Sequence, residues 1–224
     1  VNLADATWPV LRFKDRHNFY NVSSGDRGIL EVSSDGSNWT RIYSVSSVRA
    51  DWTEQQIDLS RWRGQANLRI RFYIESDGSG VDDGWHIDDL SVAEHTPGSA
   101  QTLPFAENFE TGLGNWLNGG WAAAGNAYEG NSAAEAFPSR WTPRYREGNM
   151  VLARELNLSG ATAPQITFRA RLSQGNSDHV NVYLRISRPD GPVWRNHDFR
   201  IENSTEWKRH QFAIPAAYCV ADAR

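Results

Sequence analysis

The chain has 224 residues and a formal net charge of -4, from 23 Lys and Arg against 27 Asp and Glu. Its length suffices for one large all-β domain or for two ordinary ones. No apolar run approaches the roughly 20 residues that span a bilayer, so a membrane-embedded protein is excluded. No basic block marks a nucleic-acid footprint, and the single cysteine, Cys219, excludes a disulfide scaffold.

Alternating apolar and polar residues predict strands along the whole chain. An Asp35-Gly36 pair is a hairpin-type turn signal, and residues 68–75 then alternate with a period of two. Residues 166–172 and 182–186 show the same alternation, and Asp190-Gly191 follows them as a second turn signal. No window shows a helical stripe. The sequence therefore predicts an all-β protein with one face of each sheet on a core.

An internal repeat indicates two copies of one module. A shift of 155 residues superimposes several matched residues in a single register: Asn2-Leu3 on Asn157-Leu158, Pro9 on Pro164, Phe13 on Phe168, Trp39 on Trp194 and Trp52 on Trp207. The apolar phase slips by one residue before the Asp-Gly turns, which indicates a small difference in turn length.

The repeat predicts how the chain divides. Residues 1–94 are expected to be the later strands of a first module, 95–103 a linker, and 104–224 a second module that lacks its last strands. Residues 104–155 have no counterpart in the first copy. If each sandwich is incomplete, exchange between copies or assembly with neighbouring chains is expected to cover the open edges.

Two segments carry a resemblance to a known group of modules. Residues 82–92, DDGWHIDDLSV, resemble the closing strand of MAM-like jelly rolls, and residues 105–116, FAENFETGLGNW, are similar to their first strand. This group includes the C-terminal domains of immune-inhibitor-A-type bacterial metallopeptidases, gingipain-type cleaved-adhesin domains and choice-of-anchor modules. The resemblance covers most of the chain. Each motif is loose alone, whereas their order and spacing together are more specific.

The resemblance implies tandem jelly-roll β-sandwiches that serve as non-catalytic accessory or adhesion modules of a secreted or cell-surface bacterial protein. Such modules often hold a structural calcium ion that ties the first strand to the last. The ligand candidates are Asp88 and Asp89 in the first copy and Glu107 and Glu110 in the second. The alternative for all four is an ordinary surface carboxylate. Calcium prefers six to eight hard oxygen ligands, so neither pair would be a whole site.

Ten tryptophans raise a second possibility, a carbohydrate-binding module, because indole faces stack on sugar rings. The four tryptophans at matched positions in the two copies are predicted to pack in the core. Trp8, Trp116, Trp121 and Trp141 lie outside the matched pairs and are expected to be more exposed. Of these, Trp116, Trp121 and Trp141 are the candidate ligand-binding residues. A third possibility is a purely structural repeat of an extracellular assembly.

Catalytic motifs do not stand out in the sequence. The six histidines are not linked by HExxH or another metal-binding spacing, and there is no Gly-x-Ser-x-Gly elbow or phosphate-binding loop. The expected partners are an extracellular protein or a glycan, and any catalytic domain is expected outside this chain. The sequence thus predicts a module that is not an enzyme.

Overall fold

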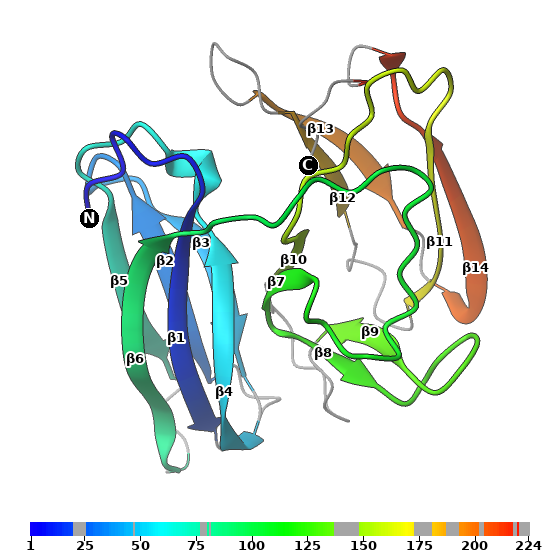
Figure 1. Ribbon diagram of the computed structural model, residues 1–224. Coiled ribbons are helices and arrows are strands. Elements are labelled where there is room, and N and C mark those ends of the chain that lie inside the picture. Colours follow the sequence, from blue (N-terminus) through cyan, green and yellow to red (C-terminus); the bar gives the residue numbers. More distant parts are fainter. Residues whose placement is uncertain are drawn as a thin grey trace. The chain divides into compact units, whose positions relative to one another are not determined.

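The computed structural model divides the chain into two compact units (Figure 1). The first unit contains Val1–Thr96, Phe109–Gly125 and Asn131–Val151, and the second contains Pro97–Asn108, Asn126–Gly130 and Leu152–Arg224. The structure describes residues 1–19, 26–46, 48–76, 80, 82–136, 148–172, 181–186, 193–201, 204–216 and 219, and it describes only the backbone of 181–186 and 193–200. The module boundaries at residues 94 and 104 stay predictions.

Two three-stranded antiparallel sheets form the body of the first unit. One has the order β4-β1-β6, so that β1 lies between the other two strands, as Figure 1 shows. The second has the order β3-β2-β5. The strands are β1 (Pro9–Asn18), β2 (Arg27–Ser33), β3 (Thr40–Val45), β4 (Val48–Asp58), β5 (Arg69–Glu75) and β6 (Gly84–Glu94), and a 3-10 turn, η1 (Ser60–Trp62), follows β4.

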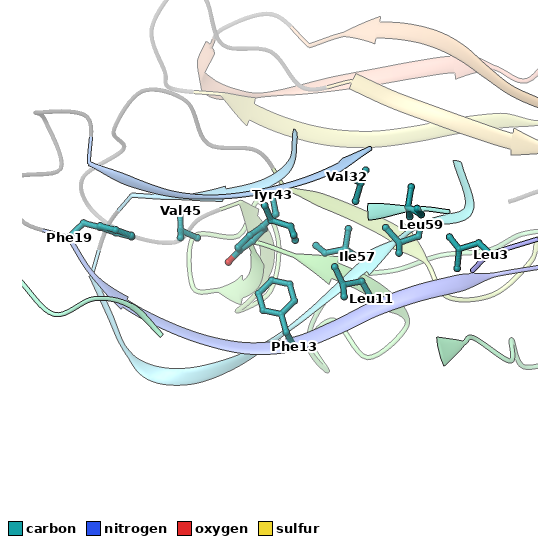
Figure 2. Close-up of a cluster of buried hydrophobic side chains, with 11 residues drawn as sticks. Leu3, Leu11, Phe13, Phe19, Val32, Tyr43, Val45, Ile57 and Leu59 are labelled. Carbon is teal, nitrogen blue, oxygen red and sulfur yellow. The ribbon is translucent and has the colours of Figure 1, made fainter. Parts of the chain in front are cut away.

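The core of the first unit lies between these two sheets. In β1, buried Leu11 and Phe13 alternate with the more exposed Arg12 and Lys14, as the period of a strand requires. Figure 2 shows Leu11 and Phe13 pointing from β1 into the space that Tyr43 also fills. The buried cluster draws on both sheets: Leu3, Leu11, Phe13, Phe19, Leu30, Val32, Tyr43, Val45, Ile57, Leu59 and Leu68. The two sheets thus form a sandwich, held mainly by apolar burial.

The remaining described strands form four two-stranded sheets. They are β7 (Trp116–Gly119) with β10 (Asn149–Leu152), β8 (Trp121–Ala124) with β9 (Ala133–Ala136), β11 (Gln165–Leu172) with β14 (Ser204–Ala213), and β12 (Asn181–Ile186) with β13 (Val193–Arg200). The all-β prediction is confirmed. Nowhere in the described ranges is there a helix that could cross a membrane.

The β11–β14 pair reproduces the β1–β4 pair at the predicted offset of 155 residues. Val10 pairs with Asp58 and Gln165 with Ala213, and both ladders have one irregularity at the same point, between Asp15 and His17 and between Ala170 and Leu172. The bonds that begin these ladders also match. Leu59 N–H donates to Pro9 C=O (2.9 Å), and Ile214 N–H donates to Pro164 C=O (2.8 Å). The internal repeat is therefore a repeat of backbone structure.

The hairpins of the two copies differ in register. Thr40 pairs with Val32 in the β2–β3 hairpin. In the β12–β13 hairpin, Arg195, at the position of Thr40, pairs with Leu184. This partner lies three residues earlier than the offset predicts. The phase slip of one residue before the Asp-Gly turns is smaller than this change in register.

Candidate functional site

Asp88 and Asp89 lie in β6, at a β-bulge against β1. Arg12 pairs with Ser91 and Lys14 with Asp88, so Asp89 and Leu90 face a single residue of β1. Asp89 adopts a left-handed φ of 51°, which Asp tolerates better than most residues. Its carboxylate forms an ion pair with Lys14 Nζ at 2.7 Å, and this hydrogen bond raises the pKa of Lys14. Asp88 Oδ1 accepts the N–H of Asp89 (2.7 Å).

Glu110 joins two loops of the first unit. Its carboxylate accepts the N–H of Ser132 (2.9 Å) and the N–H of Asn131 (2.9 and 3.1 Å). These backbone donors lower the pKa of Glu110. Glu107, the other predicted ligand of the second copy, is half-buried and falls in the second compact unit. The structure therefore gives Glu110 a role in fixing a loop.

A calcium ion would need more oxygen ligands than these residues supply together. Within the described part of the chain, no three His, Cys, Asp or Glu side chains gather closely enough to hold a metal ion. Protein donors already occupy oxygens of Asp89 and Glu110. Calcium takes six to eight oxygen ligands, so a site at Asp88 or at Glu110 would need further oxygen donors, and calcium binding stays a prediction.

Several tryptophans differ from the sequence prediction: Trp39 and Trp207, expected in the core, are only half-buried, and the side chain of Trp194 lies outside the described residues. Trp8 and Trp52 differ most. Trp8, expected to be exposed, is 1% exposed and packs edge-on against His95, with ring centroids 4.6 Å apart. Trp52, expected in the core, is 46% exposed. The reason is position. Trp8 directly precedes β1, and its C=O accepts the N–H of His95, the residue after β6. Trp52 lies in the exposed half of β4, before the strand becomes buried at Gln55. Both predictions were wrong.

Of the three candidate ligand-binding tryptophans, the structure describes two. Trp116 in β7 and Trp121 in β8 are half-buried, and the indole N–H of each is buried without a hydrogen-bond acceptor among the described residues. Trp116 packs against Phe109, with ring centroids 6.1 Å apart. Trp141 lies outside the described residues. Ligand binding by these tryptophans stays a prediction.

The fully buried carboxylate of Asp15, which the sequence reasoning missed, joins several strands of the first unit. Asp15 is 0% exposed and lies on the inward face of β1, in line with Leu11 and Phe13. Its carboxylate accepts hydrogen bonds from side chains of three other strands: Tyr43 Oη (3.0 Å), Arg49 Nη1 (2.8 Å), Gln55 Nε2 (2.9 Å) and Trp85 Nε1 (3.1 Å). The signal was available, because an Asp on the apolar face of a predicted strand must be paired.

The Asp15 cluster connects the two sheets and the segment between β7 and β8. Tyr43 belongs to the β3-β2-β5 sheet, whereas Arg49, Gln55 and Trp85 belong to the sheet of Asp15. Burial, together with the charge of Asp15, raises the pKa of Tyr43 well above its usual range. Gln55 Oε1 also accepts the N–H of Gly120, between β7 and β8 (2.9 Å). Asp15 is inaccessible to a substrate, and its hydrogen bonds hold β3, β4 and β6 in position against β1.

Arginine and tryptophan are stacked at equivalent points of the two copies. Arg16 Cζ lies 5.4 Å from the ring centroid of Trp52, and Arg171 Cζ lies 5.3 Å from that of Trp207. The offset of 155 residues relates both partners. In the second unit, Arg169 Cζ also lies 4.0 Å from the ring centroid of Tyr128, which is 44% exposed. Cationic and aromatic side chains therefore share the outer faces of the repeated strand pair.

Comparison with known proteins gives one match of limited extent. Over 89 residues, 39% of this chain, the sequence is 34% identical to Bacillopeptidase F of Bacillus subtilis (strain 168). The match covers 6% of the length of that protein, so the chain corresponds to a small part of the relative. No family model matches the chain, and no solved structure matches it.

Proposed function

We propose that this chain is a non-catalytic accessory module of an extracellular protein that also carries a peptidase. The observation that carries the proposal is the match to a small part of Bacillopeptidase F, together with the all-β sandwich of the first unit. The sequence resemblance to MAM-like modules of bacterial metallopeptidases supports the same assignment. The carboxylate of Asp15 is enclosed in the core and holds strands together.

The test has a negative and a positive part. The purified chain is incubated with casein and with fluorogenic peptides, and we expect no cleavage above that of a boiled sample. Cleavage that copurifies with the folded chain would overturn the proposal. In the positive part, the chain is sedimented with intact bacterial cells, and we expect it in the pellet. Its complete recovery in the supernatant would contradict an accessory role at a cell surface.

Calcium stabilisation belongs to the same proposal and has its own measurement. The thermal unfolding midpoint is compared in 2 mM EDTA and in about 5 mM CaCl₂, a concentration that saturates extracellular calcium modules. Specific binding to the folded state raises the midpoint, and Asp88→Ala should abolish the rise. Equal midpoints in calcium and EDTA would remove calcium from the proposal and leave the accessory role untouched.

Carbohydrate binding is a second candidate function, and a specific observation favours it. The repeated strand pair presents arginine stacked on aromatic rings in both copies, and Tyr128 and Trp52 are each more than two-fifths exposed. Exposed aromatic faces and ordered guanidinium groups are common means of holding sugars and their acidic substituents. An accessory module that binds a glycan would place a peptidase near a polysaccharide-rich surface.

A further inference from the structure

The second unit has an exposed cationic face on the β11–β14 pair. Arg169, Arg171 and Arg209 are all exposed, and together with Tyr128 and Trp207 they are called the arginine face. Arg169 and Arg209 are directly paired across the two strands. The opposite face carries Phe168, His210 and Phe212, whose rings pack together with centroids 5.4 to 6.3 Å apart. The arginines therefore lie on the outer side of this ribbon.

Like charges at a cross-strand pair destabilise a sheet, and the first copy avoids this arrangement. There, Lys14 occupies the position of Arg169 and pairs across the strands with Glu54, while Asp89 forms an ion pair with Lys14. In the second copy, Arg209 stands where the first copy has Glu54. The same backbone thus carries a base–acid pair in one copy and a base–base pair in the other.

The three arginines also have no acidic partner among the described residues. Ion pairs in that part of the chain involve Lys14, His17, Arg27, Arg49 and Arg71, all of which lie in the first unit. Arg169 and Arg171 are instead stacked on Tyr128 and Trp207. Tyr128 and Trp207 themselves lie edge to face, with centroids 6.3 Å apart. A guanidinium stacked on a ring keeps its N–H edge free for a carboxylate.

We infer that the arginine face binds an extended, carboxylate-bearing polysaccharide. Strand geometry places the Cα atoms of the neighbouring arginines about 5 to 7 Å apart, along β11 and across to β14, and a row of arginines at this spacing suits a chain with repeated carboxylates. The exposed ring of Tyr128 adds a surface on which a sugar ring can stack. The net charge of -4 works against unselective polyanion binding. This inference rests on the proposed accessory function and gives its ligand class.

Oligogalacturonate is the probe, titrated into the full chain by calorimetry at 150 mM salt. We expect saturable binding that Arg209→Glu, which restores the acid found in the first copy, weakens by about tenfold or more. Arg171→Gln should weaken it in the same direction, and this variant adds no new charge. Lys14→Glu, at the equivalent of Arg169 in the first copy, is the matched control and should leave the affinity unchanged. Circular dichroism and urea unfolding verify that each variant folds.

Each other outcome has a definite meaning. No binding of oligogalacturonate, or equal affinity in Arg209→Glu and the unchanged chain, overturns the inference. Equal binding of poly-glutamate or of DNA overturns the assignment to a polysaccharide, because the face would then recognise charge alone. Methyl-esterified oligogalacturonate should not bind, and if it does, the arginines are not the determinants. None of these results touches the proposed accessory role, which fails separately if the chain cleaves casein.

Discussion

The β1–β4 pair of the first copy and the β11–β14 pair of the second have the same register and the same irregularity, yet their inward faces differ in chemistry. The first copy places Asp15 inside its sandwich, with Arg49 and Gln55 as two of its donors. The equivalent positions of the second copy hold Ala170, Ser204 and His210. The second copy thus lacks the carboxylate of the first and has other residues at the positions of these two donors.

The difference teaches that a few positions specify the shared backbone. Both copies begin with a buried leucine, Leu3 or Leu158, whose carbonyl accepts an N–H three residues later. Both then bond a buried aliphatic residue, Leu59 or Ile214, to a proline carbonyl at the start of the first strand. With the ladder fixed by these contacts, the faces of the strands are free to diverge. The inward face diverged at Asp15 and the outward face at Glu54.

The largest expected effect comes from breaking the Asp15 cluster. Asp15→Ala gives β1 the residue of the second copy but leaves the side chain of Arg49, only 22% exposed, without its carboxylate. The expected loss in the free energy of unfolding is about 3–5 kcal/mol. Urea denaturation measures the loss. Adding Arg49→Ser, again the residue of the second copy, should recover part of it by removing the unpaired charge.

Lys14→Ala is the control for this experiment, because it breaks an exposed ion pair on the neighbouring outward position. Exposed pairs of this kind contribute at most about 1 kcal/mol. A loss for Asp15→Ala no greater than that of Lys14→Ala would mean that the cluster does not hold the first sandwich together.

A smaller effect is expected at Gly28, where the closing strand of the first copy meets β2. The ring of Trp85 lies over this glycine, so that an added Cβ would be 2.6 Å from Trp85 Cδ2. Gly28→Ala should therefore displace Trp85, a donor to Asp15, and reduce the free energy of unfolding by about 1–3 kcal/mol. Loss of near-ultraviolet circular dichroism would report the displaced indole. Gly114→Ala, with no atom within 4 Å of the added Cβ, should change neither measurement.

The sequence predicted the repeated features well because they have a local signal. Period-two alternation identified β5 and β11, and matched tryptophans identified the 155-residue offset that the strand registers follow. Trp8 and Trp52 were assigned to the wrong environments, because an indole fits both a core and an exposed face. Recurrence at Trp52 and Trp207 reflected a stacking partner, Arg16 or Arg171, on an outer face.

The Asp15 cluster could be only half predicted. Asp15 and His17 fall on the same face of β1 as Leu11 and Phe13, so a buried polar group was visible in the pattern. Its donors come from β3, β4 and β6, up to 70 residues away along the chain. Pairing between such distant strands depends on topology, which the alternation of a single strand does not contain.

The arginine–tryptophan stacks give a third, smaller prediction that tests the similarity of the outer faces. A double-mutant cycle with Arg16→Ala and Trp52→Ala should yield a coupling of about 0.5–1 kcal/mol, as expected for an exposed cation–π pair. The cycle with Arg171→Ala and Trp207→Ala should yield the same value, because the two distances differ by only 0.1 Å. Unequal coupling energies would show that the two copies share the geometry of the stack but not its contribution to stability.

The smallest expected effect concerns the Asp35-Gly36 turn and appears as a pH dependence. The side chain of Asn38 and the N–H groups of Asn38 and Ser37 donate to Asp35, and these hydrogen bonds lower the pKa of its carboxyl group. A folded-state pKa below the unfolded value of about 3.9 means that the ionised group stabilises the fold above that pH. This contribution is lost as the pH falls below about 4 toward the folded-state pKa.

The stability difference between the unchanged chain and Asp35→Asn should therefore be largest near neutral pH and should narrow in acid, as urea unfolding between pH 7 and pH 2.5 would show. A difference that stays constant over this range would mean that the charge of Asp35 does not matter to the turn. Asp190→Asn extends the comparison to the second copy. Because the β12–β13 register departs from the offset by three residues, we expect this variant to show a weaker pH dependence. An equal pH dependence would indicate that the charge of Asp190 stabilises its turn as the charge of Asp35 does, although the register of the neighbouring strands differs.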